Sequence, residues 1–280
     1  MLPCIMEKRN IAVIFDVDDV IIKTIQTISK AYKNISSNFG ISEDIQQSLI
    51  GKVDNDFNFK FLDANGKIKG KIVNLTKYTA QQAKNSGIEI NENEYSAAVR
   101  QEFDNKYLNS EIFDDIVSLI DNISSKVKYK PVAVSNNSQI NITNLFDTLN
   151  LTSKFGAIVG LTPDADGYGH VNGKPKTDST MKALRTIGAE DKKIPKIQIG
   201  DRDSDMQTAN NLYLEGHEKV VGIHLDTHNI PLAEAEENGF YKKPIYEDKD
   251  RHKVEYKIPI LRFSNAEDIE MNLGSIFNSI

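Results

Sequence analysis

The sequence contains a single cysteine, Cys4, and no apolar segment approaching the roughly 20 residues that a membrane-spanning helix needs. One cysteine excludes an intrachain disulfide and a zinc cluster built from cysteines. The first ten residues, MLPCIMEKRN, lack the apolar centre of a secretory signal peptide. We therefore expect a soluble chain that works in the reducing cytoplasm, without a membrane partner.

Basic residues are too few for a general nucleic-acid binder. The 280 residues include 34 Lys and Arg against 40 Asp and Glu, a formal net charge of −6, whereas neutralising a phosphate backbone takes clustered cations. A small phosphorylated substrate remains possible, because it needs only a few local cations or a metal ion. The 39% hydrophobic and 26% charged residues indicate a globular protein of one large or two ordinary domains.

Short apolar segments predict the buried strands of a parallel sheet. They occur at 11–15, 131–134, 196–199 and 219–223. Because segments with helical periodicity separate them, we predict an α/β fold with a doubly wound, mostly parallel sheet. A last strand is predicted at 258–262, followed by a helix, and the highly charged segment 242–257 is predicted to lie at the surface.

The segment from 20 to 109 interrupts this alternation. Apolar residues at helical spacing predict one helix over about 21–39 and another over about 92–108. A crossover between parallel strands needs only about a dozen residues or more, so we interpret the segment as an inserted, mainly helical domain. The predicted core then comprises 1–19 and 110–280.

One turn signal stands out inside the predicted insertion. Asn65-Gly66 lies within the alternating segment 57–72, and Asn-Gly is the strongest two-residue signal for a β-hairpin. We therefore predict a small hairpin there.

Asp16 and Asp18 directly follow the first predicted strand. In extended backbone, residues two apart point to the same side, so both carboxylates can face a ligand at the carboxyl end of the strand. Carboxylates this close need a cation between them, or one must be protonated. A metal-bound carboxylate can act as a nucleophile and a protonated one as a general acid. The simpler alternative is an Asp-rich turn.

Groups suited to phosphate follow the second predicted strand and precede a later helix. Ser135 and Asn136 offer a hydroxyl and backbone N–H groups, which can bind phosphate oxygens, although both residue types are also ordinary helix caps. Gly173-Lys174-Pro175 presents a cation within a turn. Lys176 is a competing candidate, and the sequence does not choose between the two lysines.

The third predicted strand ends in Gly200-Asp201-Arg202-Asp203-Ser204-Asp205. Asp201 and Asp205 are four residues apart, across a strand end and the first turn of a helix. Carboxylate oxygens of this kind suit Mg²⁺. Acidic residues are also common at helix N-termini, which leaves simple capping as the alternative.

Two other metal-like patterns are weaker. The segment 164–169 resembles the start of an EF-hand loop, but Tyr168 and Pro175 stand where essential ligands belong. His224 and His228 are four residues apart without the Glu of a zinc-protease motif. We assign a metal site to neither pattern.

Four short motifs with acidic, hydroxyl or lysine side chains occur in a fixed order along the chain, and this order is more specific than any one motif alone. Strand–Asp-x-Asp, strand–Ser, Gly-Lys-Pro–helix and strand–Gly-Asp-x-x-x-Asp resemble the four motifs of the haloacid dehalogenase-like (HAD) hydrolase superfamily. The resemblance covers about 9–20 and 112–225, and implies a Rossmann-like core. The segment 20–109 lies where many members carry a helical cap. Asp19-Val20 departs from the Gly-Thr of many members, and the chain beyond about 229 has no counterpart.

The resemblance also implies a mechanism. Asp16 would attack phosphorus to form an aspartyl-phosphate, and Asp18 would first protonate the leaving oxygen and then activate water. The implied metal ligands are Asp16, Asp18 through its backbone carbonyl and Asp201, with Asp205 supporting the metal either directly or through another ligand. The implied phosphate-binding residues are Ser135, Asn136 and Lys174. Dehalogenases and phosphonatases of this superfamily lack the acid at the position of Asp18, so its presence favours a phosphate ester.

Our leading hypothesis is a Mg²⁺-dependent phosphomonoesterase for a small phosphorylated metabolite. The cap would close over the substrate, exclude water and set specificity. One alternative is a phosphomutase of the same superfamily, which would use the same residues. The other is a non-catalytic phospho-receiver or binding module, but receivers are much shorter and lack the insertion. We expect no nucleic-acid partner.

Overall fold

The computed structural model describes residues 7–50, 58–59, 73–161, 173–225, 245–247, 253–278 and 280. The chain forms two compact units. The core unit joins Met1–Ile21 to Ile112–Ile280, and the inserted unit is Ile22–Glu111. Both predicted boundaries, after residues 19 and 109, fall two residues before the observed ones. None of the described helices combines the length and apolar character needed to cross a membrane.

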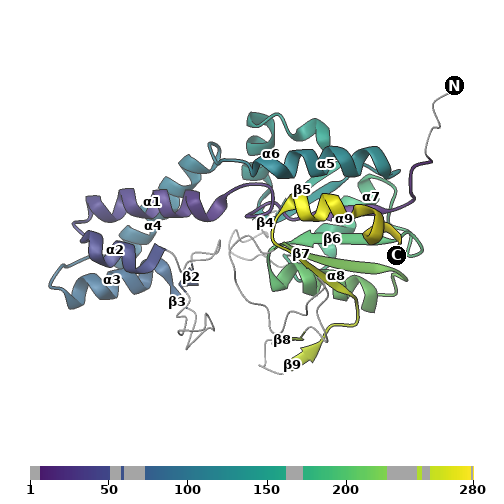
Figure 1. The fold of residues 1–280 in the computed structure, drawn as a ribbon. Helices are drawn as coiled ribbons and strands as arrows, with labels where there is room; N and C mark the ends of the chain where they lie inside the picture. The colour runs from purple at the N-terminus through teal and green to yellow at the C-terminus, as the bar shows by residue number, and fades with distance from the viewer. Residues whose placement is uncertain are drawn as a thin grey trace. The chain divides into compact units, whose positions relative to one another are not determined.

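The core unit is a doubly wound α/β fold around a six-stranded parallel sheet (Figure 1). Its strands, in spatial order, are β10 (Ile260–Phe263), β7 (Val220–Leu225), β6 (Lys196–Gly200), β1 (Ala12–Phe15), β4 (Val132–Ser138) and β5 (Ala157–Leu161). Every neighbouring pair in this sheet is parallel. The structure confirms the predicted fold class.

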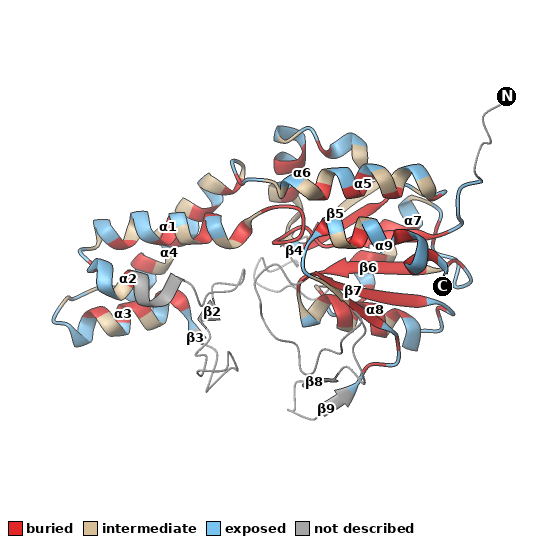
Figure 2. Cartoon of the chain, in the orientation of Figure 1, coloured by how far each residue is buried: buried red, intermediate tan, exposed pale blue. Residues whose placement is uncertain are grey.

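Burial explains why the sequence marked most of these strands so clearly. Every residue of β1, β6 and β7 is buried (Figure 2), as expected for parallel strands covered on both faces. β5 is the strand that the sequence did not predict. Its first two residues are only half-buried, and Gly160 interrupts its apolar run. A Cβ at Gly160 would lie 2.8 Å from the Gln139 backbone, so the position requires glycine.

Helices cover both faces of the sheet. They are α5 (Asp114–Lys126), α6 (Gln139–Thr148), α7 (Asp178–Thr186), α8 (Asp203–Leu214) and α9 (Ala266–Asn278), with a 3₁₀ turn, η1 (Thr152–Lys154). Leu184 of α7 packs in one cluster with Ile14 of β1. Phe15, the next residue of β1, contacts Phe155. Successive strand residues point to opposite faces, so β1 contributes to the packing on both sides.

The charged segment 242–257 was predicted to lie at the surface. The structure describes a short antiparallel pair there, β8 (Ile245–Glu247) and β9 (Lys253–Glu255). The prediction is wrong for Tyr256, which is 6% exposed and packs with Ile258 against Met206 of α8. The aromatic ring belongs to the core because it packs in one cluster with the apolar residues Met206, Ala209 and Leu212 of α8.

The inserted unit is mainly helical. It contains α1 (Thr24–Asn38), α2 (Glu43–Ile50), α3 (Leu75–Asn85) and α4 (Glu92–Tyr107), and α1 packs against α4. The sequence did not predict α2 or α3. The strands β2 (Asn58–Phe59) and β3 (Val73–Asn74) pair antiparallel, as in a hairpin. The predicted turn at Asn65-Gly66 lies outside the described residues.

Hydroxyl groups lie among the apolar residues on the buried face of α1. Tyr32 hydrogen-bonds Thr79 at 3.1 Å, and the Ser36 hydroxyl lies 2.6 Å from that of Tyr95. Buried polar groups are tolerated when they are paired in this way. The helix also begins at Thr24 and not near Ile21, which belongs to the core unit.

Candidate active site

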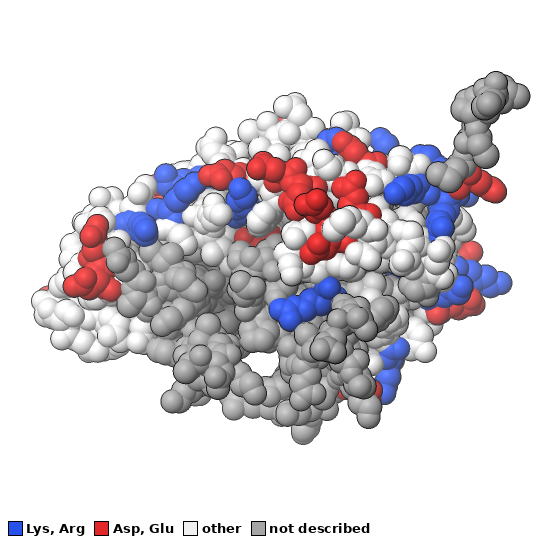
Figure 3. Space-filling model, viewed as in Figure 1, with Lys and Arg blue, Asp and Glu red and all other residues white. Residues whose placement is uncertain are grey.

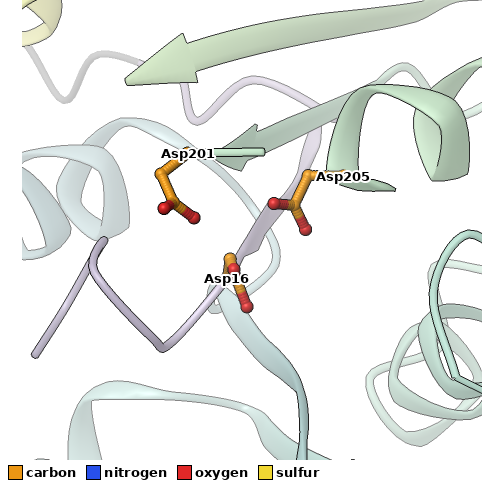
Figure 4. A group of neighbouring side chains, drawn as sticks. All are labelled: Asp16, Asp201 and Asp205. Carbon is orange, nitrogen blue, oxygen red and sulfur yellow. The ribbon is translucent and has the colours of Figure 1, made fainter. Parts of the chain in front are cut away.

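Three carboxylates meet at the carboxyl end of the sheet (Figure 4). Asp16 follows β1, Asp201 follows β6, and Asp205 lies in the first turn of α8. β1 and β6 are parallel neighbours in register, so their carboxyl ends lie side by side. One oxygen from each carboxylate falls within 4.8 Å of the others. The structure thus brings together residues separated by almost 190 positions of sequence, as the predicted topology requires.

Asp205 reaches this cluster because Gly200 has no side chain. A Cβ at Gly200 would lie only 2.3 Å from the Cβ of Asp205, closer than non-bonded carbon atoms can approach. The backbone N–H of Arg202 also lies 3.3 Å from the Asp205 carboxylate. The glycine before Asp201 therefore allows the first turn of α8 to fold back against the end of β6.

Lys174 is the cation inside the cluster. Its Nζ lies 2.5 Å from Oδ1 of Asp16 and 2.5 Å from Oδ1 of Asp205, and all three side chains are at most 5% exposed. Lys176, the competing candidate, is exposed. The structure therefore places Lys174 at the acidic site.

The carboxylates outnumber the ammonium group, and burial raises the pKa of two of them, Asp16 and Asp201. Burial and the neighbouring Asp205 raise the pKa of Asp16 to about 7, although Lys174 opposes the rise. Burial also raises the pKa of Asp201 well above its ordinary value, against the effect of Arg202. Burial alone would lower the pKa of Lys174, but Asp16 and Asp205 raise it overall. A further positive charge would stabilise this group of buried carboxylates.

Asp201 provides an open ligand atom for such a charge. Its side chain is 4% exposed, and its Oδ1 accepts no hydrogen bond from the residues that the structure describes. The other oxygen lies 3.9 Å from Nε of Arg202. A buried oxygen without a donor is uncommon in proteins. The Asp201 carboxylate, together with those of Asp16 and Asp205, forms an all-oxygen donor set that suits a hard divalent cation such as Mg²⁺.

Ser135 and Asp18 are joined directly. The Ser135 hydroxyl, which is fully buried in β4, donates to Oδ2 of Asp18 at 2.7 Å and accepts from the backbone N–H of Asn137 at 2.8 Å. The predicted general acid and the predicted phosphate-binding hydroxyl therefore lie at the same end of two adjacent strands. No described contact tests the expected role of the Asp18 carbonyl as a metal ligand.

The side chain of Asn136 contacts the lysine loop. The backbone N–H of Lys174 donates to Oδ1 of Asn136 at 2.8 Å, and Asn211 of α8 donates to the carbonyl of Pro175 at 2.9 Å. The loop is thus held from β4 and from α8. Phosphate binding by Asn136 stays a prediction, and the sequence carried no signal for Asn211.

Asp19 departs from the glycine of many superfamily members, and its backbone shows why aspartate is accepted. Its φ is +57°, in the left-handed region that glycine adopts freely. Asp and Asn are the residues that otherwise visit this region most readily. Asp19 as a residue is 1% exposed, so a further carboxylate is buried next to the site.

His224 was set aside in the sequence as half of a histidine pair. In the structure its Nε2 lies 2.9 Å from the backbone carbonyl oxygen of Asp201. Burial lowers its pKa to about 4. His228 and the EF-hand-like segment 164–169 lie outside the described residues. Sequence spacing could not reveal the contact, because it depends on the alignment of β6 with β7.

A known protein family matches most of this sequence. Residues 13–215, most of the chain, match the family model described as haloacid dehalogenase-like hydrolase. A comparison with curated proteins found no match to this sequence.

Solved structures share the fold. A HAD-superfamily hydrolase of subfamily IA, variant 1, from Geobacter sulfurreducens is 13% identical with a TM-score of 0.56, covering 96% of this chain and 98% of that chain. A provisionally named phosphoglycolate phosphatase from Lactobacillus plantarum is 14% identical, with a TM-score of 0.51 and coverage of 94% and 98%. A provisionally named β-phosphoglucomutase from Thermotoga maritima is 17% identical, with a TM-score of 0.52 and coverage of 76% and 85%. The chain belongs to the haloacid dehalogenase-like hydrolase family.

Proposed function

We propose that the protein is a Mg²⁺-dependent phosphomonoesterase that acts on a small phosphorylated metabolite in the cytoplasm. The observation that carries the proposal is the buried constellation of Asp16, Asp201 and Asp205 with Lys174, in which the carboxylates outnumber the cation. The excess negative charge of such a site can be balanced by a divalent cation. The cation and Lys174 can in turn balance the negative charge of a phosphoryl group. Membership of a hydrolase family supports the same reaction class.

The metal-binding residues would be Asp16, Asp201 and Asp205, with the backbone carbonyl of Asp18. When bound, Mg²⁺ would supply positive charge for the transferring phosphoryl oxygens. Lys174 would supply the second cation, from a position already fixed between two carboxylates.

The chain's own residues would then carry the two displacement steps. In the first, a carboxylate oxygen of Asp16 bonds to phosphorus, the ester P–O bond breaks with its electron pair going to the leaving oxygen, and Asp18 gives that oxygen a proton. In the second, Asp18 takes a proton from water as the water oxygen bonds to phosphorus, and the bond to Asp16 breaks. Ser135 and Lys174 would hold the phosphoryl oxygens throughout.

Surface charge is consistent with a small substrate. On the face drawn in Figure 3, the described Lys and Arg side chains lie interspersed with Asp and Glu. A protein that follows a nucleic-acid backbone would instead cluster its cations in one basic surface. The net charge of −6 points the same way.

The test is release of inorganic phosphate from an aryl phosphate and from a panel of phosphorylated metabolites, with Mg²⁺ or with EDTA. We expect metal-dependent hydrolysis by wild type and its loss in Asp16→Asn. Asp114→Asn, the same change at an exposed residue in the first turn of α5, serves as the control and should retain activity. Near-wild-type turnover by Asp16→Asn would refute the nucleophile assignment. Transfer of phosphate between positions of a hexose phosphate, in place of its release, would favour the phosphomutase.

A further inference from the structure

His224 is a buried polar residue beside the site to which the mechanism above gives no role. It lies in β7, is 2% exposed, and places Nε2 2.9 Å from the backbone carbonyl oxygen of Asp201. A carbonyl oxygen can only accept a hydrogen bond, so Nε2 carries the proton and donates it. The contact is therefore a hydrogen bond that His224, in the sheet, donates to the backbone of Asp201. Asp201 is the residue whose Oδ1 accepts no hydrogen bond from the described residues.

The contact occurs at the point where the strand pairing ends. β6 and β7 are aligned from Lys196–Val220 to Gly200–His224. Asp201 is the next residue along the chain, and the His224 side chain bonds its carbonyl group. The backbone of Asp201 is thus tied to the sheet at the residue where the chain leaves the strand.

The Asp201 side chain has little else to orient it. Its Oδ1 accepts no hydrogen bond from the described residues, and Nε of Arg202 lies as far as 3.9 Å from Oδ2. The direction of the carboxylate consequently depends on the position of its backbone. A rotation of that peptide would move the Asp201 carboxylate relative to Asp16 and Asp205.

We propose that His224 is a positioning residue for the metal site, which holds the Asp201 backbone so that its carboxylate faces the other two carboxylates. The inference rests on the metal site of the proposed function. Groups that hydrogen-bond to a metal-ligating residue orient it, and their loss typically weakens metal affinity by about 10–100-fold.

The experiment measures Mg²⁺ binding directly, by isothermal titration calorimetry, so that no substrate or turnover is needed. His224→Phe keeps a planar ring and removes the donor. His224→Gln returns an N–H group close to the position of Nε2. Val221→Ala, at a buried residue of the same strand, lowers stability without touching Asp201 and controls for a merely structural effect. Circular dichroism verifies that each variant is folded.

We expect His224→Phe to weaken Mg²⁺ binding by about 10–100-fold, with His224→Gln and Val221→Ala close to wild type. Equal Mg²⁺ affinity in wild type and His224→Phe would overturn the inference and leave the proposed function intact. An equal loss in Val221→Ala would also overturn it, because destabilisation alone would then account for the effect. Absence of Mg²⁺ binding by wild type would overturn the proposed metal site and the role of His224 with it.

Discussion

Replacing Gly200 by alanine tests the packing that brings Asp205 into the site. The added Cβ would lie 2.3 Å from Cβ and 2.4 Å from Oδ2 of Asp205. Ordinary van der Waals contact begins near 3.4 Å, so Asp205 must retreat by about 1 Å or the end of β6 must shift. Neither movement is free, because parallel pairing with β1 and β7 holds β6, and Asp205 belongs to the first turn of α8.

Overpacking of this kind costs about 1–3 kcal/mol in well-packed interiors. We therefore expect Gly200→Ala to lower the free energy of unfolding by about that amount. In thermal unfolding each kcal/mol corresponds to about 2–4 °C for a domain of this size. The retreat of Asp205 should also break its contact with Lys174 and reduce phosphatase activity. Urea unfolding followed by circular dichroism measures the stability, and the phosphate-release assay measures the activity.

Gly274→Ala is the matched control, because the chemical change is identical and the surroundings differ. Gly274 lies within the exposed side of α9, and an added Cβ there would meet no heavy atom within 4 Å. Alanine in a helix interior is favoured over glycine by about 0.5–1 kcal/mol. The two variants should thus shift stability in opposite directions. If Gly200→Ala unfolded at the same urea concentration as wild type, the close approach of Asp205 would be refuted.

Three further changes test other parts of the account. Lys174→Met should lower turnover by about 10²–10³-fold, as for loss of one charge-stabilising donor, while Lys176→Met, at an exposed lysine, should not; equal effects in steady-state kinetics would contradict the assignment. Asp201→Asn should raise the Mg²⁺ concentration needed for half-maximal activity, and Asp203→Asn should leave the metal titration unchanged. Burial, with nearby lysines, lowers the pKa of His217 from 6.5 to about 4, so its contribution to stability is present above pH 6.5 and disappears as the pH falls toward 4. His217→Gln should flatten that part of the stability–pH curve measured by urea unfolding, and an unchanged curve would count against a buried, neutral His217.

The sequence predicted features that depend on strand order and local spacing. Asp16 follows a fully apolar strand, and Asp201 follows another, so a parallel sheet alone was enough to bring their carboxylates to one edge. The helix at Glu92–Tyr107 was predicted to within a residue because its apolar spacing is regular. β5 was missed because Gly160 breaks its apolar run, although it is glycine there that lets the start of α6 approach.

Contacts between distant segments were beyond the sequence for a physical reason. The choice of Lys174 over Lys176 depends on which of two nearby lysines the turn directs inward. The bond from His224 to Asp201 depends on the alignment of two strands, and the burial of Tyr256 depends on where a returning segment meets α8. None of these has a local periodic signature, because each is decided by tertiary packing.

Trapping the covalent intermediate tests the central claim most directly. Asp18→Asn removes the group that we propose activates water, while an aryl phosphate with a good leaving group needs no protonation. The first step should therefore proceed and the second should stall. After incubation with such a substrate and Mg²⁺, mass spectrometry of the intact variant should show one added phosphoryl group, and peptide mapping should place it on Asp16. The double variant Asp16→Asn/Asp18→Asn should show none. A phosphoryl group on another residue, or none on Asp16 while wild type hydrolyses the same substrate, would contradict the proposed mechanism.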